Sequence, residues 1–550
     1  MNNKWLPLQA LTASLMMAGY VQNLRGQGPE FNWAENGGNS SFSEGNVAIA
    51  AAEPGGFYLA GEFTGTAQFG TLAVTSSGGY DFFLAHFHEN GTPDWILRFG
   101  GTDNDYISSM ELTPAGNVIL GGYFYGTTQI GNETFTSAGS QDLFLASLSA
   151  DGAFHWAEHI SSVQTDYLNA LTVDPSGNIL TAGKFYEDIH IGDTALISQG
   201  SADFFIAKFT PEGALLWIEQ GGGDFSDNAV SIAADANSNL FVSGSFYSEI
   251  RLGDSIYTTT NPTGVFLARY TGESDLVWAY ILDGTDLNAS SSVQTDNDGN
   301  VFIAGYFSDL LHLGSQTFQA GEFDTDVYIA KFTGAGSPDW AGHGGSDASD
   351  DVISMDVDEH GNAYLTGHYL LDITFGNIGL DYTLCCGSAE IYVVKYDNKG
   401  IPVWGTQISG ERAKINRIDV TDGGNGLFAG IFQNEVNMGD ITLQATADFN
   451  NFFGKMSWEN LTDIHIREDL TTQIYPNPAG DRIFIRKDIN TGMKVSIFDL
   501  NGRNVKTDYL DAGTMSNAID ISDLAGGVYT LVISRENGEV ISFDKVLVNN

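Results

Sequence analysis

The stretch NGLFAGIFQN, residues 425–434, contains the triplet Gly430-Ile431-Phe432, and this glycine-x-aromatic pattern occurs seven times in the chain. The other copies are Gly61-Glu62-Phe63, Gly122-Tyr123-Phe124, Gly183-Lys184-Phe185, Gly244-Ser245-Phe246, Gly305-Tyr306-Phe307 and Gly367-His368-Tyr369. Successive copies lie 61 to 63 residues apart. A period of this kind is typical of a solenoid, a propeller or an array of repeats.

A series of tryptophans separates these architectures. Each of the first six triplets is followed, 34 to 37 residues later, by a member of the series Trp95, Trp156, Trp217, Trp278, Trp340 and Trp404. The seventh triplet has none at that distance, but Trp33 lies 62 residues before Trp95. A repeat divided between the two ends of the chain closes a ring, whereas an open array gives no reason for the division. We therefore predict that the N-terminal strand completes the last repeat.

The second repeat shows the expected strands. They are Ile107–Thr113, Val118–Phe124, Asp142–Leu148 and Phe154–Ile160, and Asp151-Gly152 is a hairpin turn between the last two. Apolar residues alternate or run continuously over five to seven residues, which is strand spacing. Four strands per repeat is the pattern of a propeller blade. The sequence thus predicts an all-β fold, a seven-bladed β-propeller closed by the N-terminal strand.

Charge limits the class of partner. The formal net charge is −46 and the sequence pI is about 4.1, which argues against nucleic acid and anionic membrane surfaces as partners. Residues 461–550 hold 9 of the 23 bases and 13 of the 69 acids, so they carry −4 and residues 1–460 carry −42. This shift predicts a propeller over 27–460, a linker over 461–473 and a separate domain over 474–550.

The N-terminal residues 1–26 have the pattern of a secretory signal, with Lys4 before the apolar run Trp5–Tyr20. Cleavage before Gln27 and cleavage after Ala18 both remain open. No other stretch approaches membrane length, so we expect no transmembrane span in the mature protein. The two cysteines, Cys385 and Cys386, are adjacent and a bridge between neighbours is strained, so disulfides do not build the fold.

The pattern of short strands in the last segment, with Asn-Gly turns at 501–502 and 537–538, predicts a small β-sandwich. Its motifs are Tyr475-Pro476-Asn477-Pro478, Val495–Arg503, Gly526-Gly527-Val528-Tyr529 and Lys545–Val548. With these four blocks in order, residues 474–550 resemble the C-terminal sorting domain of the type IX secretion system of Bacteroidota. The resemblance implies that the secretion machinery recognises a sorting motif that includes Pro476, Asn477, Pro478, Gly527, Tyr529 and Lys545. It implies a secreted or outer-membrane surface location, with attachment and release both open.

A second resemblance covers residues 27–457. The blocks Asp174–Gly183, Asp203–Phe209 and Gly213–Trp217 resemble bacterial seven-bladed-propeller repeats of the SBBP kind. This family implies the fold and leaves the ligand open, because function on a propeller is grafted onto its loops.

The best candidate site is a series of acids ten residues after the tryptophans. Its members are Asp105, Asp166, Asp227 and Asp350, in the loop that leads from the outermost strand of one blade to the innermost strand of the next. Such loops gather near one mouth of the central channel, and clustered carboxylates suit Ca²⁺. The structural alternative is that a recurring Asp satisfies loop N–H groups in every blade. Lys414 occupies the same place after Trp404.

Other polar patterns point to structure. Asp81, Asp142, Asp203 and Asp326 each begin a third strand, where a turn hydrogen bond explains them. His155 and His159 lie on a strand, where their spacing separates them by about 13 Å, too far to share zinc. Asp296-Asn297-Asp298-Gly299-Asn300 resembles half a calcium loop but has Phe307 where the closing Glu belongs, so we interpret it as a turn.

These observations favour a non-enzymatic exported propeller that acts as a binding, adhesion or scaffold module. The alternative is an extracellular polysaccharide hydrolase or lyase that uses the acids at the channel mouth. Recurring acids favour the first hypothesis, because catalysis needs a pair in one unique environment. We expect a monomer whose ligand is a glycan or a protein, with no cofactor other than Ca²⁺.

Overall fold

The computed structural model describes residues 29–40, 46–52, 55–284, 288–321, 324–383, 388–421 and 424–458, followed by 473–475, 482–486, 493–498, 504–510, 516–522, 524–535 and 540–548. Every regular element in these ranges is a β-strand, so the expected all-β fold is confirmed. Contacts divide the chain into a unit Gln27–Trp458 and a second unit that includes Glu459–Asn550. The predicted signal sequence, Cys385 and Cys386 lie outside the described residues.

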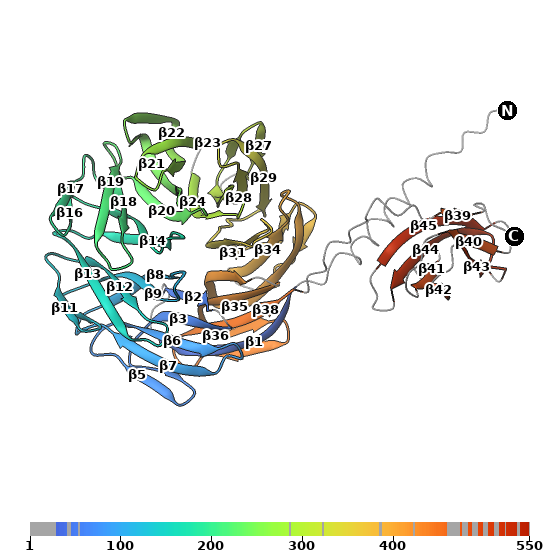
Figure 1. Ribbon diagram of the computed structural model, residues 1–550, viewed down its shortest axis with the longest axis horizontal. Helices are drawn as coiled ribbons and strands as arrows, with labels where there is room; N and C mark the ends of the chain where they lie inside the picture. Colours follow the sequence, from blue (N-terminus) through green and yellow to red (C-terminus); the bar gives the residue numbers. More distant parts are fainter. Residues whose placement is uncertain are drawn as a thin grey trace. The chain divides into compact units, whose positions relative to one another are not determined.

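The first unit consists of seven repeats of four antiparallel strands (Figure 1). The first strands are β2 (Val47–Ala51), β8 (Asp105–Leu112), β14 (Tyr167–Val173), β20 (Asn228–Ala234), β24 (Asn288–Thr295), β30 (Ser354–Val357) and the later part of β35 (Pro402–Thr421). The second strands are β3 (Gly56–Phe63), β9 (Val118–Phe124), β15 (Ile179–Phe185), β21 (Leu240–Leu252), β25 (Val301–Phe307), β31 (Ala363–Tyr369) and β36 (Asn425–Met438). The expected strands Val118–Phe124 and Asp142–Leu148 are confirmed to the residue.

The third and fourth strands complete each repeat. The third strands are β6 (Asp81–His88), β12 (Asp142–Leu148), β18 (Asp203–Phe209), β22 (Ser255–Tyr270), β28 (Asp326–Phe332), β34 (Glu390–Tyr396) and β38 (Phe449–Ser457). The fourth strands are β7 (Pro93–Phe99), β13 (Phe154–Ser162), β19 (Leu215–Gly221), β23 (Leu276–Gly284), β29 (Pro338–Gly345), the early part of β35 and β1 (Glu30–Ser40). Each repeat therefore runs through four consecutive strands, except that the seventh takes its last strand from the N-terminus.

Small hairpins follow the second strands. They are β4 (Thr66–Phe69) with β5 (Leu72–Thr75), β10 (Thr127–Ile130) with β11 (Glu133–Thr136), β16 (Asp188–Ile191) with β17 (Thr194–Ile197), β26 (Leu310–Leu313) with β27 (Gln316–Gln319), β32 (Ile373–Phe375) with β33 (Ile378–Leu380), and the end of β36 with β37 (Ile441–Gln444). In repeat 4, the end of β21 pairs with the start of β22 in the same way. Three of these hairpins, β16–β17, β26–β27 and β32–β33, also pair with the fourth strand of the preceding repeat, which joins neighbouring repeats.

The recurring triplet glycine has a steric cause. A Cβ atom at Gly122 would lie 2.0 Å from the backbone oxygen of Tyr106 and 2.8 Å from the ring of Phe144. The first and third strands thus close on the second strand, and any larger residue would push them apart. The same first-strand oxygen blocks a Cβ at five triplet glycines: Gly183, Gly244, Gly305, Gly367 and Gly430.

The two ends of the first unit are joined by strand pairing. β1 pairs antiparallel with β38, with Trp33 opposite Lys455 and Glu30 opposite Ser457. One hydrophobic cluster includes Val47 and Phe57 of repeat 1 with Leu427 and Phe453 of repeat 7. The first strands β2 and β35 lie in contact, as do the first strands of consecutive repeats. Repeats 1 and 7 therefore share a core.

Tryptophans pack between neighbouring repeats. Trp156 covers Gly213 in the hairpin turn of the next repeat, and its indole N–H donates to the backbone oxygen of Pro211 at 3.0 Å. The indoles of Trp217, Trp278 and Trp340 donate in the same way to turn oxygens 55 to 58 residues further on. Trp33 covers Gly91 of repeat 1, where a Cβ atom would lie 3.3 Å from its ring. Trp33 thus contacts repeat 1 as the other tryptophans contact their following repeats.

The second unit has two sheets. One is β39 (Gln473–Tyr475), β40 (Arg482–Arg486) and β43 (Ser516–Asp520), and the other is β42 (Asn504–Leu510), β41 (Met493–Phe498), β44 (Gly527–Arg535) and β45 (Val540–Val548). Ile483 and Ile519 of the first sheet share a buried cluster with Val495 and Leu531 of the second. Two antiparallel sheets that share one buried cluster are the arrangement expected for a small β-sandwich.

Candidate functional site: the central cavity and its rim

The seven first strands line a cavity of about 240 Å³, here called the central cavity. Residues of all seven repeats contribute to it, and one equivalent position is occupied by Ala48, Ser109, Ala170, Ser231, Ser292, Ser354 and Arg417. Arg417 is the one long side chain in this series. The other members are small, so the repeat-7 side chain has room to extend.

Hydrogen bonds between neighbouring repeats cross the wall of the cavity. The hydroxyl of Ser231 accepts from the N–H of Val293 at 3.0 Å. The carboxylate of Asp356 accepts from the N–H of Val420 at 2.7 Å, and that of Asp419 accepts from the N–H of Ala51 at 2.5 Å. The bond of Asp419 links repeat 7 to repeat 1, so these polar side chains join the first strands to one another.

A charged layer lies at one level of the cavity. The guanidinium of Arg417 binds the carboxylate of Glu111 at 2.6 Å, and Asp356 and Asp419 occupy the place of Glu111 in repeats 6 and 7. Burial raises the pKa of Asp356, and the neighbouring Asp419 carboxylate contributes to the rise. Burial also raises the pKa of Glu111 and of Asp419, although the charge of Arg417 lowers both. One cation thus faces three carboxyl groups whose pKa values are all raised.

The rim position is the first-strand residue that lies opposite the middle residue of the triplet. It holds Tyr106 opposite Tyr123, Tyr167 opposite Lys184, Asn228 opposite Ser245, Ala289 opposite Tyr306 and Lys414 opposite Ile431. In repeat 6 the corresponding pair is Asp351 and His368, whose side chains are 3.2 Å apart. Lys414 lines the central cavity and lowers the pKa of Asp351 and Glu62. The rim position varies from repeat to repeat.

The predicted acids lie one residue before the rim position. Asp105, Asp166, Asp227 and Asp350 are each at most 1% exposed. Three of them hold a backbone N–H of their own loop: Asp105 accepts from Gly101 at 2.7 Å, Asp227 from Gly223 at 2.6 Å and Asp350 from Ser346 at 2.7 Å. Asp166 and Asp227 accept from the N–H that follows the second strand of their repeat, that of Tyr186 at 3.0 Å and that of Tyr247 at 3.3 Å. These bonds are the ones that the structural alternative requires.

Each predicted acid also lies beside the acid that begins the third strand of the preceding repeat. Burial raises the pKa of Asp105 to about 7, and the charge of Asp81 adds to the rise. Burial raises the pKa of Asp350 to about 8, with Asp326 adding to it. The pKa values of Asp166 and Asp227 rise to about 6 for the same reasons, next to Asp142 and Asp203.

The third-strand acids have partners of their own. Asp81 pairs with Arg98, Asp142 with His159 at 2.6 Å, and Asp326 with His343 at 2.5 Å. One buried oxygen of Asp81 and one of Asp326 have no hydrogen-bond donor in the described part of the chain. Among the described residues, no three His, Cys, Asp or Glu side chains are placed to share a metal ion. Calcium at these acids stays a prediction.

The turn at Asp296 is confirmed. Its carboxylate accepts from the N–H groups of Asp298 and Asn300 at 3.0 and 2.9 Å, and it binds the ammonium of Lys331 at 2.9 Å. Asp174 makes the same arrangement with Asn178 and Lys208. These carboxylates therefore hold the turn between the first and second strands.

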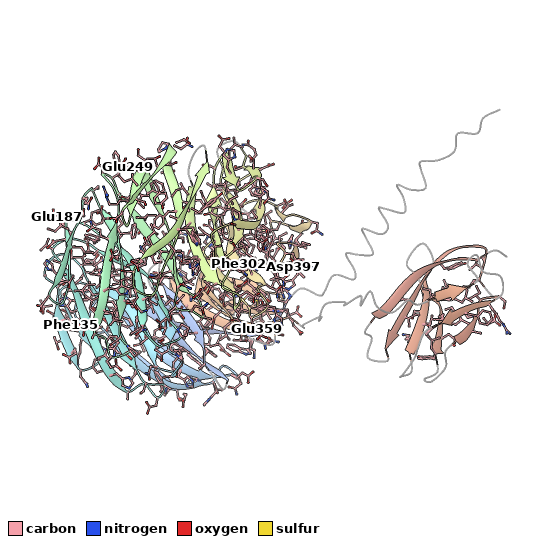
Figure 2. All side chains as sticks on the ribbon, turned by 45° about the horizontal axis from the view of Figure 1, so that its top comes forward. Phe135, Glu187, Glu249, Phe302, Glu359 and Asp397 are labelled. Carbon is pink, nitrogen blue, oxygen red and sulfur yellow. The ribbon has the colours of Figure 1, made fainter. Side chains whose placement is uncertain are left out.

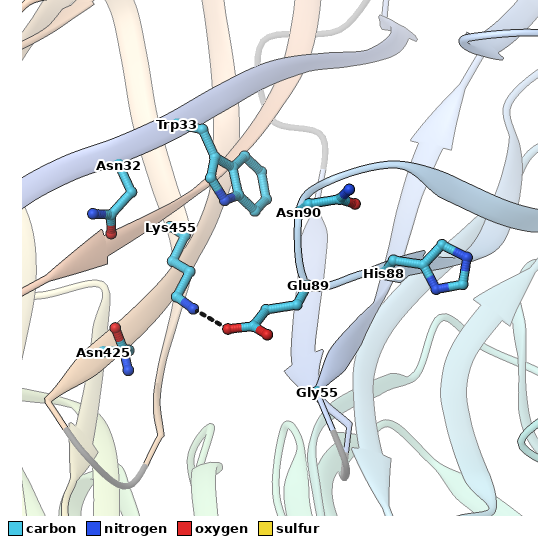
Figure 3. A pocket seen from close by; sticks show the side chains of 8 residues that line it. All are labelled: Asn32, Trp33, Gly55, His88, Glu89, Asn90, Asn425 and Lys455. Atoms are coloured by element: carbon cyan, nitrogen blue, oxygen red, sulfur yellow. Dashed lines mark hydrogen bonds and ion pairs between the residues drawn. The ribbon is translucent and has the colours of Figure 1, made fainter.

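A second pocket, of about 560 Å³, lies where repeat 7 meets repeat 1 (Figure 3). Figure 3 shows Lys455 extended toward Glu89, and their side chains form an ion pair of 2.8 Å. This pair lowers the pKa of Glu89. Trp33, His88 and Asn90 line the remaining walls. The junction between repeats 7 and 1 is thus bridged by an ion pair between two side chains.

The surface outside these sites is acidic. Glu187 and Glu249, for example, are exposed at the periphery of the first unit (Figure 2). In repeats 2, 3, 4 and 6 sequence reasoning chose the residue directly before the rim position. In repeat 7 it placed Lys414 with the acids, but Lys414 lies at the rim position, and Ala413 is the equivalent of Asp105. The signal for the rim was available: residues that serve the fold recur, whereas this place holds Tyr, Asn, Ala, Asp or Lys.

Comparison with protein families identifies the tail. Residues 473–549 match the secretion system C-terminal sorting domain, and they include Gly527, Tyr529 and Lys545 of the expected motif. The hydroxyl of Tyr529 donates to the backbone oxygen of Ala525 at 2.8 Å, whereas Pro476, Asn477 and Pro478 lie outside the described residues. The sorting domain directs the protein out of the cell, to the cell surface or outer membrane or into the medium, through the type IX secretion machinery. No helix in the described part of the chain has the length and hydropathy of a membrane crossing.

The chain also has more distant likenesses. A WD repeat-containing protein of Acanthamoeba polyphaga mimivirus is 22% identical over 333 residues, which are 49% of this chain and 24% of that protein. The chain thus spans about a quarter of that relative. PorZ, an essential surface component of the type IX secretion system of Porphyromonas gingivalis, aligns over 92% of this chain and 81% of its own with 11% identity and a TM-score of 0.25. Sqt1 from Chaetomium thermophilum aligns over 82% of this chain and 97% of its own with 12% identity and a TM-score of 0.36.

Proposed function

We propose that this chain is an exported seven-bladed β-propeller of the SBBP kind, closed by its N-terminal strand, that acts as a non-enzymatic binding, adhesion or scaffold module outside the cell. In this proposal the propeller spans 27–460, the linker 461–473 and the sorting domain 474–550, and cleavage of 1–26 precedes export. The pairing of β1 with β38 and the shared core of repeats 1 and 7 support closure.

The observation that carries the binding role is the contrast between two adjacent positions. The acids at Asp105 and its equivalents are buried and bound to their own loops. The rim position beside them holds five residue types in repeats 2 to 7, namely Tyr106 and Tyr167, Asn228, Ala289, Asp351 and Lys414. A scaffold that keeps Asp at one position in four repeats and varies the next position is suited to presenting a specific surface.

The test is binding to intact cells. Labelled protein, residues 27–550, is titrated onto cells of the producing bacterium, and the products of polysaccharide incubations are assayed in parallel. We expect saturable binding without any new reducing ends or unsaturated sugars. Turnover of a polysaccharide, or no saturable binding, would refute the non-enzymatic module.

The alternative function, a polysaccharide hydrolase or lyase, has one observation in its favour. Burial and the neighbouring Asp419 carboxylate raise the pKa of Asp356, and the nearby Arg417 lines the central cavity; such an environment suits a proton-transfer group. The hydrogen bonds of both carboxylates to neighbouring strands account for them structurally. If this enzyme exists, Asp356→Asn abolishes turnover while the cell-binding isotherm stays unchanged.

Three further expectations complete the proposal. The unit works as a monomer, its ligand is a glycan or a protein, and Ca²⁺ is bound near Asp105, Asp166, Asp227 and Asp350. The buried acid pairs and the unpartnered oxygens of Asp81 and Asp326 support an occupant there, a proton or a cation. The secretion machinery reads Pro476, Asn477, Pro478, Gly527, Tyr529 and Lys545.

A further inference from the structure

Five tyrosines from repeats 1 to 3 form a continuous set of ring contacts, here called the tyrosine ladder: Tyr80, Tyr106, Tyr123, Tyr125 and Tyr167. Three contacts run in series along it. Tyr80 stacks on Tyr106 with centroids 5.8 Å apart, Tyr106 on Tyr123 at 4.7 Å, and Tyr123 meets Tyr167 edge-on at 6.4 Å.

The fold does not require this ladder. Tyr106 and Tyr167 occupy the rim position, where repeats 4, 5 and 7 hold Asn228, Ala289 and Lys414. The residues that the fold needs, the triplet glycines and the packed tryptophans, recur around the whole unit. A feature confined to three consecutive repeats therefore calls for an explanation other than folding.

The ladder is accessible and carries hydrogen-bonding groups. Tyr167 is 39% exposed, and the other four rings are half-buried. Tyr125 donates to Gln141 at 2.7 Å. The hydroxyls of Tyr123 and Tyr167 make no hydrogen bond to any residue that the structure describes, so they are available to a ligand.

The ladder is also electrically neutral. Burial raises the pKa of Tyr106 to about 12, and that of Tyr123 further, so both phenols keep their protons in any physiological medium. Burial holds the pKa of the adjacent Glu62 well above its ordinary range. An uncharged aromatic surface on a protein of net charge −46 offers cations no local partner, and the surrounding acids repel polyanions.

We propose that the tyrosine ladder binds a neutral polysaccharide chain. The C–H faces of sugar rings pack on exposed aromatic rings, and the phenol hydroxyls of Tyr123 and Tyr167 bind sugar hydroxyls. The serial spacing of the rings suits an extended chain better than a single sugar. This inference rests on the proposed binding function and names its ligand class.

The experiment is affinity electrophoresis of residues 27–550 in gels that contain dextran, laminarin or mannan, which are neutral, or alginate, which is anionic. We expect at least one neutral polysaccharide to retard the wild type, and alginate not to. The double variant Tyr123→Ala with Tyr167→Ala should bind that polysaccharide at least tenfold more weakly. Tyr509→Ala, which removes a 64% exposed tyrosine from the second unit, is the matched control and should bind as the wild type does.

A second double variant shows whether weaker binding comes from the lost side chains or from misfolding. Tyr123→Phe with Tyr167→Phe keeps both rings and should weaken binding about threefold, because two hydroxyls are lost. Retardation by alginate alone, by no neutral polysaccharide, or equally for wild type and both double variants overturns the inference. If the alanine variant still binds intact cells saturably, the tyrosine ladder is not the ligand site, although the proposed binding function is kept. If the wild type also fails to bind cells, the proposed function itself is refuted.

Discussion

Trp33→Ala tests whether β1 is a full member of the last repeat. The ring of Trp33 stacks on Phe57 at 5.7 Å and meets Phe453 edge-on at 6.0 Å. Replacing a buried Trp by Ala costs about 3–5 kcal/mol, and because Trp33 is half-buried we take about 3 kcal/mol. Unfolding entropy is about 2.1 cal/mol/K per residue, so for a unit of about 430 residues this loss lowers Tm by about 3 °C.

The matched control is Trp95→Ala. Trp95 is also half-buried, and it packs on Tyr58 and His86 with centroids 6.0 Å away. It belongs to a repeat whose four strands are consecutive, so its loss measures the ordinary contribution of this position. If β1 closes the last repeat, differential scanning calorimetry should show equal falls in Tm for the two variants. A terminal arm outside the fold would leave the Tm of Trp33→Ala unchanged, and that result would refute closure.

Two chain rearrangements sharpen the test. Deleting residues 27–40 removes Phe31 as well as Trp33 and leaves β38 as an unpaired edge, so we expect a Tm lower by about 5 °C and aggregation on heating. Glu30 lies opposite Ser457, so a short linker can join 458 to 27, with new ends in the exposed turn at Gly192-Asp193. This permuted unit should melt within a few degrees of the original. Failure of the permuted unit to fold would contradict the pairing.

Three further predictions concern charge and export. Because the folded-state pKa values of Asp105 and Asp350 are about 7 and 8, above the ordinary 3.8, the stability that these carboxyl groups contribute should be complete below about pH 4 and should be lost as the pH rises to 8; in melting curves, Asp350→Asn should flatten this slope. Millimolar Ca²⁺ should raise Tm at pH 8, and exchanging Asp105, Asp166, Asp227 and Asp350 for Asn should remove most of the gain; equal gains would eliminate the cation site. Removing 474–550 should leave the Tm of the first unit unchanged but stop export, so normal delivery of the truncated protein would contradict the sorting role.

The repeats were predictable because sterics impose them. Gly122 must lack a Cβ atom since the oxygen of Tyr106 and the ring of Phe144 occupy its space, and Trp156 must cover the turn at Gly213. Such requirements recur in every repeat and give the sequence its period. Strand Val118–Phe124 was predictable to the residue because all of its residues except Tyr123 are buried.

The site was less predictable, because sequence spacing does not give the direction of a side chain. Asp105 and Tyr106 are neighbours in the same strand, so they point to opposite faces. The spacing from the tryptophans identified Asp105, which faces the junction with the preceding repeat. Nor could spacing show that Arg417 would extend past small residues to Glu111, since 306 positions separate them.

The alternation of faces explains how one repeat can serve both stability and binding. At the junctions that lead into repeats 2, 3, 4 and 6 a buried acid, such as Asp105 or Asp350, is fixed by its backbone partners. The next residue faces the rim. There Asp351 of repeat 6 accepts from the backbone N–H of His368 at 2.7 Å, whereas Tyr106 of repeat 2 is replaced by the Asn, Ala or Lys of other repeats on the same fold. Binding specificity can therefore change one residue at a time at the rim, while the junctions that hold the repeats together stay constant.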